Sequence, residues 1–467
     1  MTTLFRQPRY RTAVSTVAIL AALLLTIGSA HADDAIRVLD PEPEPTWIQP
    51  GLEGIAFNVA MWSYDRYVKD YGFSHIDPST MYENLSSGWV WDKDQFSINQ
   101  FWHPYQGSFY YSAARYYGND FYVSTAFTTL GSLQWEYFME AEHASYNDLI
   151  TTTLGGSMFG EVTFRLSNAM LDPNSKGFER FLREFGATVV NPINGFNRLL
   201  SGETYRGYSR RNQPRFRRSS MLLRATTGEA IPFFVTADGD YRTRRQRLPR
   251  ANTEVLVIYG DEFKAPKPYD YFILNLGVNI VKNPVSTVSA RAQIASTEIY
   301  HSAHQRGQLL IGQNFDYIDN GMYKLGVSGV GGGYAHIRTW GDNWYHTLHT
   351  QIGIIPLGGV STEFFRQTQR DYNLGAGAFS HTRIALGQRE IWHTAFVSDR
   401  YWLHTRSGVK GDEFIGNFRF EVAHSVWKPV GVAFSLGAFD RLAKTRDHGT
   451  RSEFTQEGRL LLTYGFQ

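Results

Sequence analysis

Acidic residues and a histidine with helical spacing lie in the N-terminal half of the chain. Glu136, Glu140 and His143 are spaced i, i+4, i+7, so a helix would hold them near one face, where carboxylates and an imidazole can share a metal ion. Asp148 follows after an expected turn, and two carboxylates can also work as general acid and base. A charged helix end that caps, pairs or faces water accounts for the same residues. We favour that interpretation and expect no metal.

His103 precedes Pro104 and could act as a base together with Glu136 or Asp148. A histidine in such a place is more often a hydrogen-bonded structural residue. No Gly-x-Ser-x-Gly motif surrounds the serines of this region, so a nucleophile elbow is not predicted. If the chain is an enzyme, which we consider the less favoured case, no cofactor is expected. Its catalytic residues would be His103, Glu136, Glu140 and Asp148.

A group of arginines follows the helical half and could contact lipid phosphates at a membrane surface. A solvated basic loop is the alternative. The whole chain has 46 Lys and Arg against 44 Asp and Glu, a balance that predicts no nucleic-acid partner. The expected partners are outer-membrane lipids, with a periplasmic or envelope protein as a further candidate. The arginines are Arg210, Arg211, Arg215, Arg217 and Arg218.

The N-terminus has the order of a secretory signal peptide. Arg6, Arg9 and Arg11 precede an apolar run, and Ala30-His31-Ala32 supplies the small residues of a cleavage site. We expect residues 1–32 to be removed and residues 33–50 to form a linker, with an N-terminal membrane anchor as the alternative. The chain has no cysteine, which suits an exported protein and excludes thiol catalysis.

Residues 51–205 have helical character and are predicted to form one domain. Ser145 is a suitable N-cap, and Pro192 should end the helix before it. Gly156 and Gly160 would allow a second helix to approach closely. No segment is apolar enough to predict a membrane span. The predicted helices cover residues 57–71, 105–117, 120–142, 145–171, 178–191 and 196–200.

Residues 206–467 alternate between apolar and polar or small residues, as β-strands do. Phe272, Leu274 and Leu276 show this period of two, and turn signals such as Asp319-Asn320-Gly321 separate the strands. The pattern is typical of an antiparallel transmembrane barrel of about twelve strands. The fold class is therefore α+β, with a helical domain before a barrel. A soluble β-domain would alternate too, because the period does not reveal which face points outward.

A long ordered string of residues in the helical half supports this division. It includes His103-Pro104-Tyr105-x-Gly107-Ser108, Trp135-Glu136-Tyr137 and Ser145-x-Asn147-Asp148-Leu149. The string resembles the bacterial family known as domain of unknown function 3943, over about residues 99–202 and more loosely beyond. The resemblance implies an exported protein with a helical region followed by a strand-rich region, and it implies no established activity.

We expect a non-enzymatic protein of the outer membrane of a Gram-negative bacterium. Its barrel would anchor a periplasmic helical domain in an envelope or partner-binding role. A lumen of about twelve strands is too narrow for such a domain, which should lie outside it. One alternative is an outer-membrane enzyme acting on lipid or lipopolysaccharide. The other is a pore for small solutes, lined by Arg291, Asn275 and Asn279.

Overall fold

The computed structural model describes residues 36–39, 44–206, 216–219, 221–237, 250–279, 285–319, 323–365 and 370–465. The expected signal peptide, residues 1–32, and most of the expected linker lie outside the described residues.

The described part of the first half is helical, as the sequence predicts. None of its helices is both long enough and apolar enough to cross a membrane, within the described residues. Short irregular helical turns cover Asp65–Lys69, Gly72–Ser74 and Ile98–Trp102, and the last of these is η3. The α-helices are α2 (Ile48–Tyr64), α3 (Pro78–Ser86), α4 (His103–Tyr116), α5 (Phe121–Phe138), α6 (Tyr146–Met170), α7 (Gly177–Val190) and α8 (Pro192–Leu200).

Capping residues explain where several helices begin. The Ser145 side chain accepts a hydrogen bond from Asp148 N at the start of α6, and Asn191 caps α8. The helix α3 was not predicted, although Asp77 forms a capping box with Thr80 and Pro78 stands at the first helical position. The helix α2 begins earlier than predicted, because a proline is tolerated in the first turn and Pro50 lies there.

The second half forms one closed antiparallel barrel of twelve strands, in which β14 pairs with β3 to complete the circle. The predicted fold class is therefore confirmed. Before the barrel, β1 (Ile36–Leu39) pairs with β2 (Phe216–Ser219). The barrel strands are β3 (Met221–Ala237), β4 (Arg250–Tyr259), β5 (Phe272–Asn279), β6 (Val285–His301), β7 (Gln305–Asp319), β8 (Lys324–Trp340), β9 (Trp344–Ser361), β10 (Tyr372–Gln388), β11 (Trp392–Ser407), β12 (Gly411–Trp427), β13 (Val430–Thr445) and β14 (Gly449–Tyr464).

The two rims of the barrel are distinguished by the connections they carry. The C-terminal rim holds the end of β14 and the short turns 302–304, 341–343 and 389–391. The opposite rim holds the turns 408–410 and 446–448 and the longer connection 362–371.

Contacts across the barrel identify its inner face. Arg291 on β6 reaches Asp399 on β11, a strand that is not its neighbour, so both side chains lie in the lumen. Many apolar residues of the strands point the other way, and a group of them is exposed on the outside. They include Phe396, Phe420, Phe434, Leu436, Leu460 and Leu462. An apolar outside around a polar inside is the arrangement of a barrel made for lipid.

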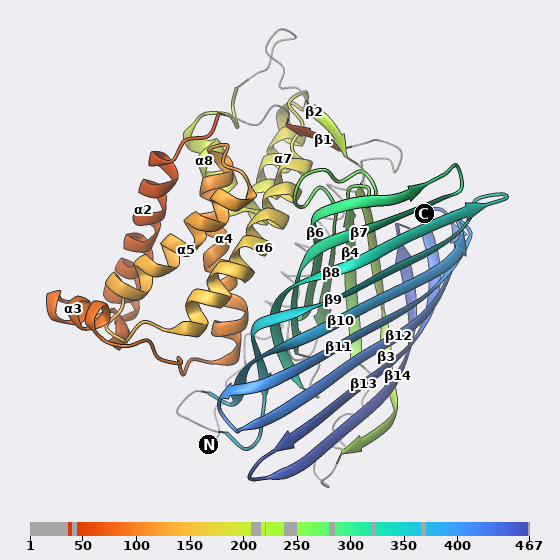
Figure 1. Ribbon diagram of the computed structural model, residues 1–467. Coiled ribbons are helices and arrows are strands. Elements are labelled where there is room, and N and C mark those ends of the chain that lie inside the picture. The colour runs from red at the N-terminus through yellow and green to blue at the C-terminus, as the bar shows by residue number, and fades with distance from the viewer. Residues whose placement is uncertain are drawn as a thin grey trace, which may run out of the picture.

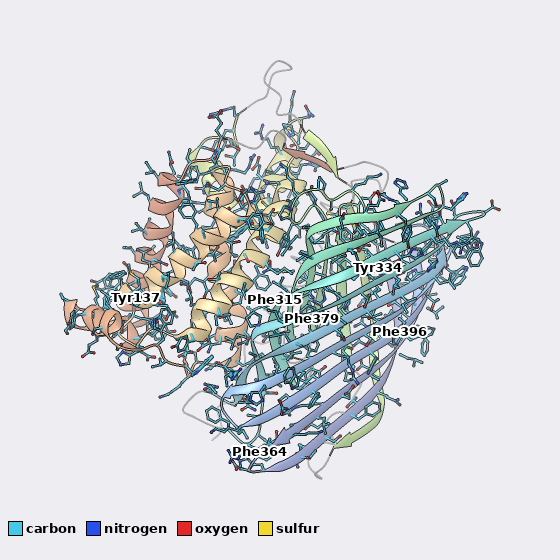
Figure 2. All side chains as sticks on the ribbon, viewed as in Figure 1. Tyr137, Phe315, Tyr334, Phe364, Phe379 and Phe396 are labelled. Carbon is cyan, nitrogen blue, oxygen red and sulfur yellow. The ribbon has the colours of Figure 1, made fainter. Side chains whose placement is uncertain are left out.

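The helical domain lies outside the lumen and packs against the outer wall of the barrel, with α6 nearest to the strands (Figure 1). Phe159 of α6 meets Phe315 of β7 with ring centroids 4.6 Å apart. Phe315 lies where the helices meet the barrel, whereas Phe396 lies on the free part of the wall (Figure 2). The largest apolar core of the described residues is thus shared between the two halves.

The helical cover of the outer wall differs from strand to strand. On β7, Phe315 and Tyr317 point outward and are buried under the helices, at 2% and 7% exposure. Nearer the C-terminal rim on the same face of β7, Leu309 and Ile311 are 50% and 52% exposed. On β4 and β5 the cover reaches the C-terminal rim, because Tyr259 and Phe272 are buried there in the shared core.

Candidate functional site

The four candidate catalytic residues are brought together near the C-terminal end of α5 and the N-terminal end of α6. Glu136 Oε2 accepts a hydrogen bond from the backbone N of Ser145 at 2.7 Å. Ser145 Oγ in turn donates to Asp148. His103, at the start of α4, places Nε2 3.4 Å from Asp148 Oδ1. The side chain of Glu140 lies beside Glu136 and accepts a hydrogen bond from Trp135 Nε1 at 3.2 Å.

His143 does not join this group. It lies on the surface, where its Nδ1 is 3.1 Å from Ser87 Oγ. The helical spacing that suggested a shared face is broken because α5 ends at Phe138. Within the described residues, no group of three or more His, Asp or Glu side chains is arranged to hold a metal ion.

Polar residues that were not singled out in the sequence complete the group. Asn147 Nδ2 donates to Asp148 Oδ1 at 2.7 Å and to Asn99 Oδ1 at 3.0 Å. Asn99 donates to Asp92 Oδ2 at 2.8 Å. Tyr372, at the start of β10, donates to the backbone oxygen of Asp94 at 3.1 Å. The group therefore ties the helical domain to the barrel.

Burial shifts the pKa values of three carboxyl groups in this cluster upward. Burial, together with the neighbouring charge of Asp148, raises the pKa of Glu136 well above its ordinary range. Burial and the charge of Glu136 do the same for the pKa of Glu140. Burial raises the pKa of Asp148 to about 6, although His103 opposes the rise. The same groups cap helix ends and bind one another, so a catalytic role for them stays a prediction.

A layer of ion pairs crosses the lumen of the barrel. Arg291 Nη2 lies 2.8 Å from Asp316 Oδ1 on β7 and 3.5 Å from Asp399 Oδ1 on β11. The hydroxyl of Tyr401 donates to Asp316 at 2.8 Å, and His381 binds Asp399. The prediction that Arg291 points into the lumen is confirmed. It joins strands on opposite sides instead of lining an open channel.

Two further ion clusters span non-neighbouring strands. Glu254 on β4 binds Arg419 on β12 at 2.6 Å and also binds Arg459 on β14. Glu421 on β12 binds Arg224 on β3 at 3.0 Å. These contacts cross-brace the barrel from the inside.

An apolar cluster fills the lumen toward the opposite rim. Its members come from the adjacent strands β7 to β12 and the connection before β8 and are buried, and Phe439 of β13 packs against them. They are Ile318, Tyr323, Leu325, Val327, Ile355, Val360, Phe379, Tyr401, Leu403 and Ile415.

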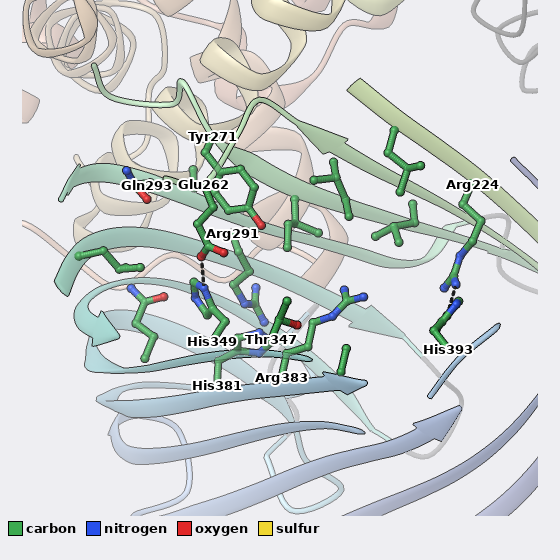
Figure 3. Close-up of a pocket in the computed structure, with 18 of the residues that line it drawn as sticks. Arg224, Glu262, Tyr271, Arg291, Gln293, Thr347, His349, His381, Arg383 and His393 are labelled. Carbon is green, nitrogen blue, oxygen red and sulfur yellow. Dashed lines mark hydrogen bonds and ion pairs between the residues drawn. The ribbon is translucent and has the colours of Figure 1, made fainter. Parts of the chain in front are cut away.

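A cavity of about 240 Å³ lies in the lumen on the side of the C-terminal rim. Its polar wall includes Arg383, His349 and His381, and Glu262 accepts or shares a hydrogen bond with His349 at 2.6 Å (Figure 3). Sequence reasoning missed these residues, because only the closed barrel brings β9, β10 and the 260–271 connection together.

The predicted lipid-binding arginines fall largely outside the described residues. This holds for Arg210, Arg211 and Arg215. The backbone of Arg217 and Arg218 lies in β2, paired with Val38 and Arg37 of β1. Their contact with lipid headgroups stays a prediction.

The profile of the family described as domain of unknown function (DUF3943) matches residues 88–193. The predicted resemblance is confirmed. The matched region contains all four candidate catalytic residues and the α4–α6 core. No curated protein matches the chain.

Three solved structures show how the barrel compares with others. The outer membrane channel DcaP of Acinetobacter baumannii is 8% identical with a TM-score of 0.25, over 53% of this chain and 97% of its own. The Pseudomonas putida toluene transporter TodX is 7% identical with a TM-score of 0.20, over 52% and 88%. Pseudomonas aeruginosa OccK2 (OpdF) is 8% identical with a TM-score of 0.20, over 53% and 97%. At these scores the likeness supports no inference about transport.

Proposed function

We propose that the protein is a non-enzymatic component of the outer membrane, in which a barrel closed to solute flow holds the helical domain at the membrane. The filled lumen carries this proposal. Ion pairs such as Arg291–Asp399 join opposite walls, and the apolar cluster around Leu325 and Leu403 occupies the opposite rim. A conducting pore needs a continuous water-filled path, which these side chains interrupt.

Single-channel recording in planar bilayers tests the closed lumen. We expect no conductance from the purified protein. A triple variant, Leu325→Ala and Leu403→Ala with Arg291→Ala, removes large side chains from the apolar cluster and from the ion-pair layer, and should open measurable current. The matched control, Leu309→Ala with Ile311→Ala, changes the same kind of residue on the exposed outer wall and should stay silent. Steady conductance of the unaltered protein would replace the proposal with the pore alternative.

Buried contacts with the barrel fix the position and orientation of the helical domain. Arg165 Nη1 of α6 lies 3.0 Å from Asp270 Oδ1 in the β4–β5 connection, and both side chains are buried. Gln313 Nε2 of β7 donates to the backbone oxygen of Leu154 at 2.8 Å. Fixed buried contacts of this kind support a scaffold in which the barrel presents the domain in one orientation.

The domain also carries an apolar surface suited to lipid. We define the α7–α8 apolar face by its exposed residues on those two helices. These are Phe178, Phe181, Phe185, Val189, Phe196, Leu199 and Leu200, which are 39–73% exposed. The charged residues of α4 and α6 are turned inward instead, as in the 2.7 Å pair of Arg115 and Glu161. An amphipathic helix with a bare apolar face is the form that lies in a membrane interface.

The α7–α8 apolar face lies at the end of α6 that is beside the C-terminal rim, where Arg165 binds Asp270. Asn147, at the start of α6, connects through Asn99 to Tyr372 near the opposite rim. The other end of α6 carries α7 and α8, since Ser167 Oγ donates to Ala187 O at 2.9 Å. We therefore propose that this face enters the same lipid layer as Leu309 and Ile311 of the barrel.

A separate experiment tests on which side of the membrane the helical domain lies. We propose that the domain is periplasmic. Short turns usually face the periplasm, and the C-terminal rim, which carries several of them, also holds the 260–271 connection that Arg165 of the helical domain contacts. The chain has no cysteine, so Tyr82→Cys on exposed α3 gives one thiol. A membrane-impermeant maleimide should label it only after the outer membrane is permeabilised. Labelling of intact cells would place the domain on the cell surface.

A further inference from the structure

We propose that the lumen cavity near the C-terminal rim binds a small organic anion with an apolar body. The proposal is independent of whether the barrel conducts, because it concerns only the wall of this cavity. Two features of the wall carry it: an arginine without an ionic partner on one side, and a group of aliphatic side chains on the other.

Arg383 on β10 is the unpaired charge. Its side chain is partly buried in the cavity wall, and no ion pair joins it to any acid among the described residues. The other charged groups of the wall are matched. Arg291 is bound by Asp316 and Asp399, Arg224 by Glu421, and Glu262 by His349. Arg383 therefore has no carboxylate of its own within the described part of the wall, and an anionic ligand would supply one.

The surroundings of Arg383 are rich in hydrogen-bond donors. Its guanidinium lies near that of Arg291, with His349 and His381 close by in the same wall (Figure 3). The rings of these histidines are 5.9 Å apart between centroids. Arg291 Nε and His349 Nε2 are buried without a hydrogen-bond partner among the described residues. A carboxylate or phosphate oxygen is the acceptor that such a wall lacks.

The facing wall is aliphatic. It is formed by side chains of β3, β4, β5 and β7, and these offer no polar group to a ligand. They are Leu222, Leu256, Ile258, Ile273 and Leu310. A ligand that satisfies both walls has a charged head at Arg383 and an apolar body against these residues. The cavity of about 240 Å³ equals the share of roughly eight water molecules, so the body is short, as in a six-carbon fatty acid.

The test uses the full-length protein in a maltoside detergent and isothermal titration with three six-carbon probes that differ only in the head group. We expect hexanoate to bind, and hexylamine and hexanol to bind at least about tenfold more weakly, since a hydrogen bond to a charged group contributes 1.5–3 kcal/mol. Inorganic phosphate, which has charge but no apolar body, should also bind more weakly than hexanoate.

Variants locate the site. Arg383→Met should weaken hexanoate binding about tenfold or more, while Arg400→Met, which alters an exposed arginine on the outer wall, should leave it unchanged. Heat-modifiable gel migration would show that each barrel is folded. The proposal is overturned if hexanol or hexylamine binds as tightly as hexanoate, if phosphate does, if Arg383→Met has no effect, or if no probe binds.

Discussion

Buried charges of the helical domain are organised as connected pairs. Glu161 accepts hydrogen bonds from Arg115 and Arg165, each at 2.7 Å, and Tyr111 donates to it at 2.8 Å. Although burial acts to raise it, these arginines lower the pKa of Glu161 to about 2. Arg165 continues the chain to Asp270. One ionised network therefore runs from the helix core into the barrel.

The Arg165–Asp270 contact should stabilise the docking of the two halves. Asp270→Asn removes one of the two carboxylates that bind buried Arg165, which keeps its contact with Glu161. The cost should therefore be smaller than the about 3–5 kcal/mol of a buried charge left with no partner. We expect the helical domain of this variant to become sensitive to limited proteolysis in detergent while the barrel stays intact. Asp261→Asn, in the same connection but in an exposed pair with Lys264, is the control. Equal resistance of both variants would contradict the assigned role.

The carboxyl cluster predicts a dependence of stability on pH. The pKa of Asp148 is 3.8 ordinarily and about 6 in the folded protein. Between these values the unfolded chain loses a proton that the folded chain keeps, so rising pH favours unfolding. The full stabilisation is present below about pH 4 and is lost by about pH 6, a change of about 3 kcal/mol.

Urea titrations followed by helical circular dichroism measure this dependence. Asp148→Asn should make the fall shallower between about pH 4 and pH 6, with the contributions of Glu136 and Glu140 remaining. Glu142→Gln, which changes an exposed acid nearby, should leave the dependence as it is. An unfolding free energy that rises with pH over this range would mean that the cluster is ionised in the folded protein.

At the scale of elements, α4 and α6 pack with almost no space between their backbones. A Cβ added at Gly156 would lie 2.6 Å from Gly107 Cα, and one at Gly160 would lie 2.5 Å from the ring of Tyr111. The close helix approach predicted from Gly156 and Gly160 is confirmed.

Gly156→Ala should therefore destabilise the helical domain by about 1–3 kcal/mol, because the backbone of α4 has to move. Gly88→Ala is the matched control, since an added Cβ there meets nothing within 4 Å. Thermal unfolding of the two variants in detergent distinguishes them. Equal melting temperatures would show that the helices can separate at little cost.

We also predict that residues of the α7–α8 apolar face lie within the lipid layer. A spin label on Phe185→Cys should be accessible to oxygen, which dissolves in lipid, and protected from a water-soluble nickel complex. A label on Tyr82→Cys, on α3, should show the reverse. If the nickel complex reaches both labels equally in liposomes, the face is covered by water or by another protein and not by lipid.

The sequence predicts the elements better than it predicts their docking. The change of period separates helices from strands, and the twelve strands follow from their length. The outward residues of β7, however, are apolar or aromatic both where lipid is expected, at Ile311, and where helices cover them, at Phe315. Alternation carries no information on which apolar neighbour a strand will meet, so a domain packed on the wall was not predicted.

The candidate sites also differ in how far the sequence predicts them. His103, Glu136, Glu140 and Asp148 belong to one contiguous helical region, and the structure gathers them. The wall of the lumen cavity could not be assembled from sequence, because its strands are far apart in the chain and meet only through closure of the barrel. Arg291 was expected in the lumen, but its partner Asp399 depends on the stagger between β6 and β11.

At the scale of the whole molecule, the protein is a barrel with ion pairs and an apolar cluster inside it, covered on one side by a helical domain. The inner ion pairs and apolar cluster brace the barrel, while η3 and α6 close over its outer wall. Gln100 of η3 lies against two glycines of the strands, and a Cβ at Gly359 would lie 3.3 Å from its Cγ. The central structural claim is that the helical domain packs on the barrel wall in the native membrane.

A disulfide formed in native outer membranes tests the docking most directly. Gln100→Cys with Gly359→Cys places two thiols within reach in a chain that has no other cysteine. After mild oxidation and then denaturation in sodium dodecyl sulfate, which exposes buried position 100, we predict that neither thiol reacts with a polyethylene glycol maleimide until a reductant is added. The control pair, Gln100→Cys with Gly341→Cys in a turn of the C-terminal rim, should react at both thiols. Two reactive thiols in the test pair would mean that the helical domain does not sit on the barrel wall.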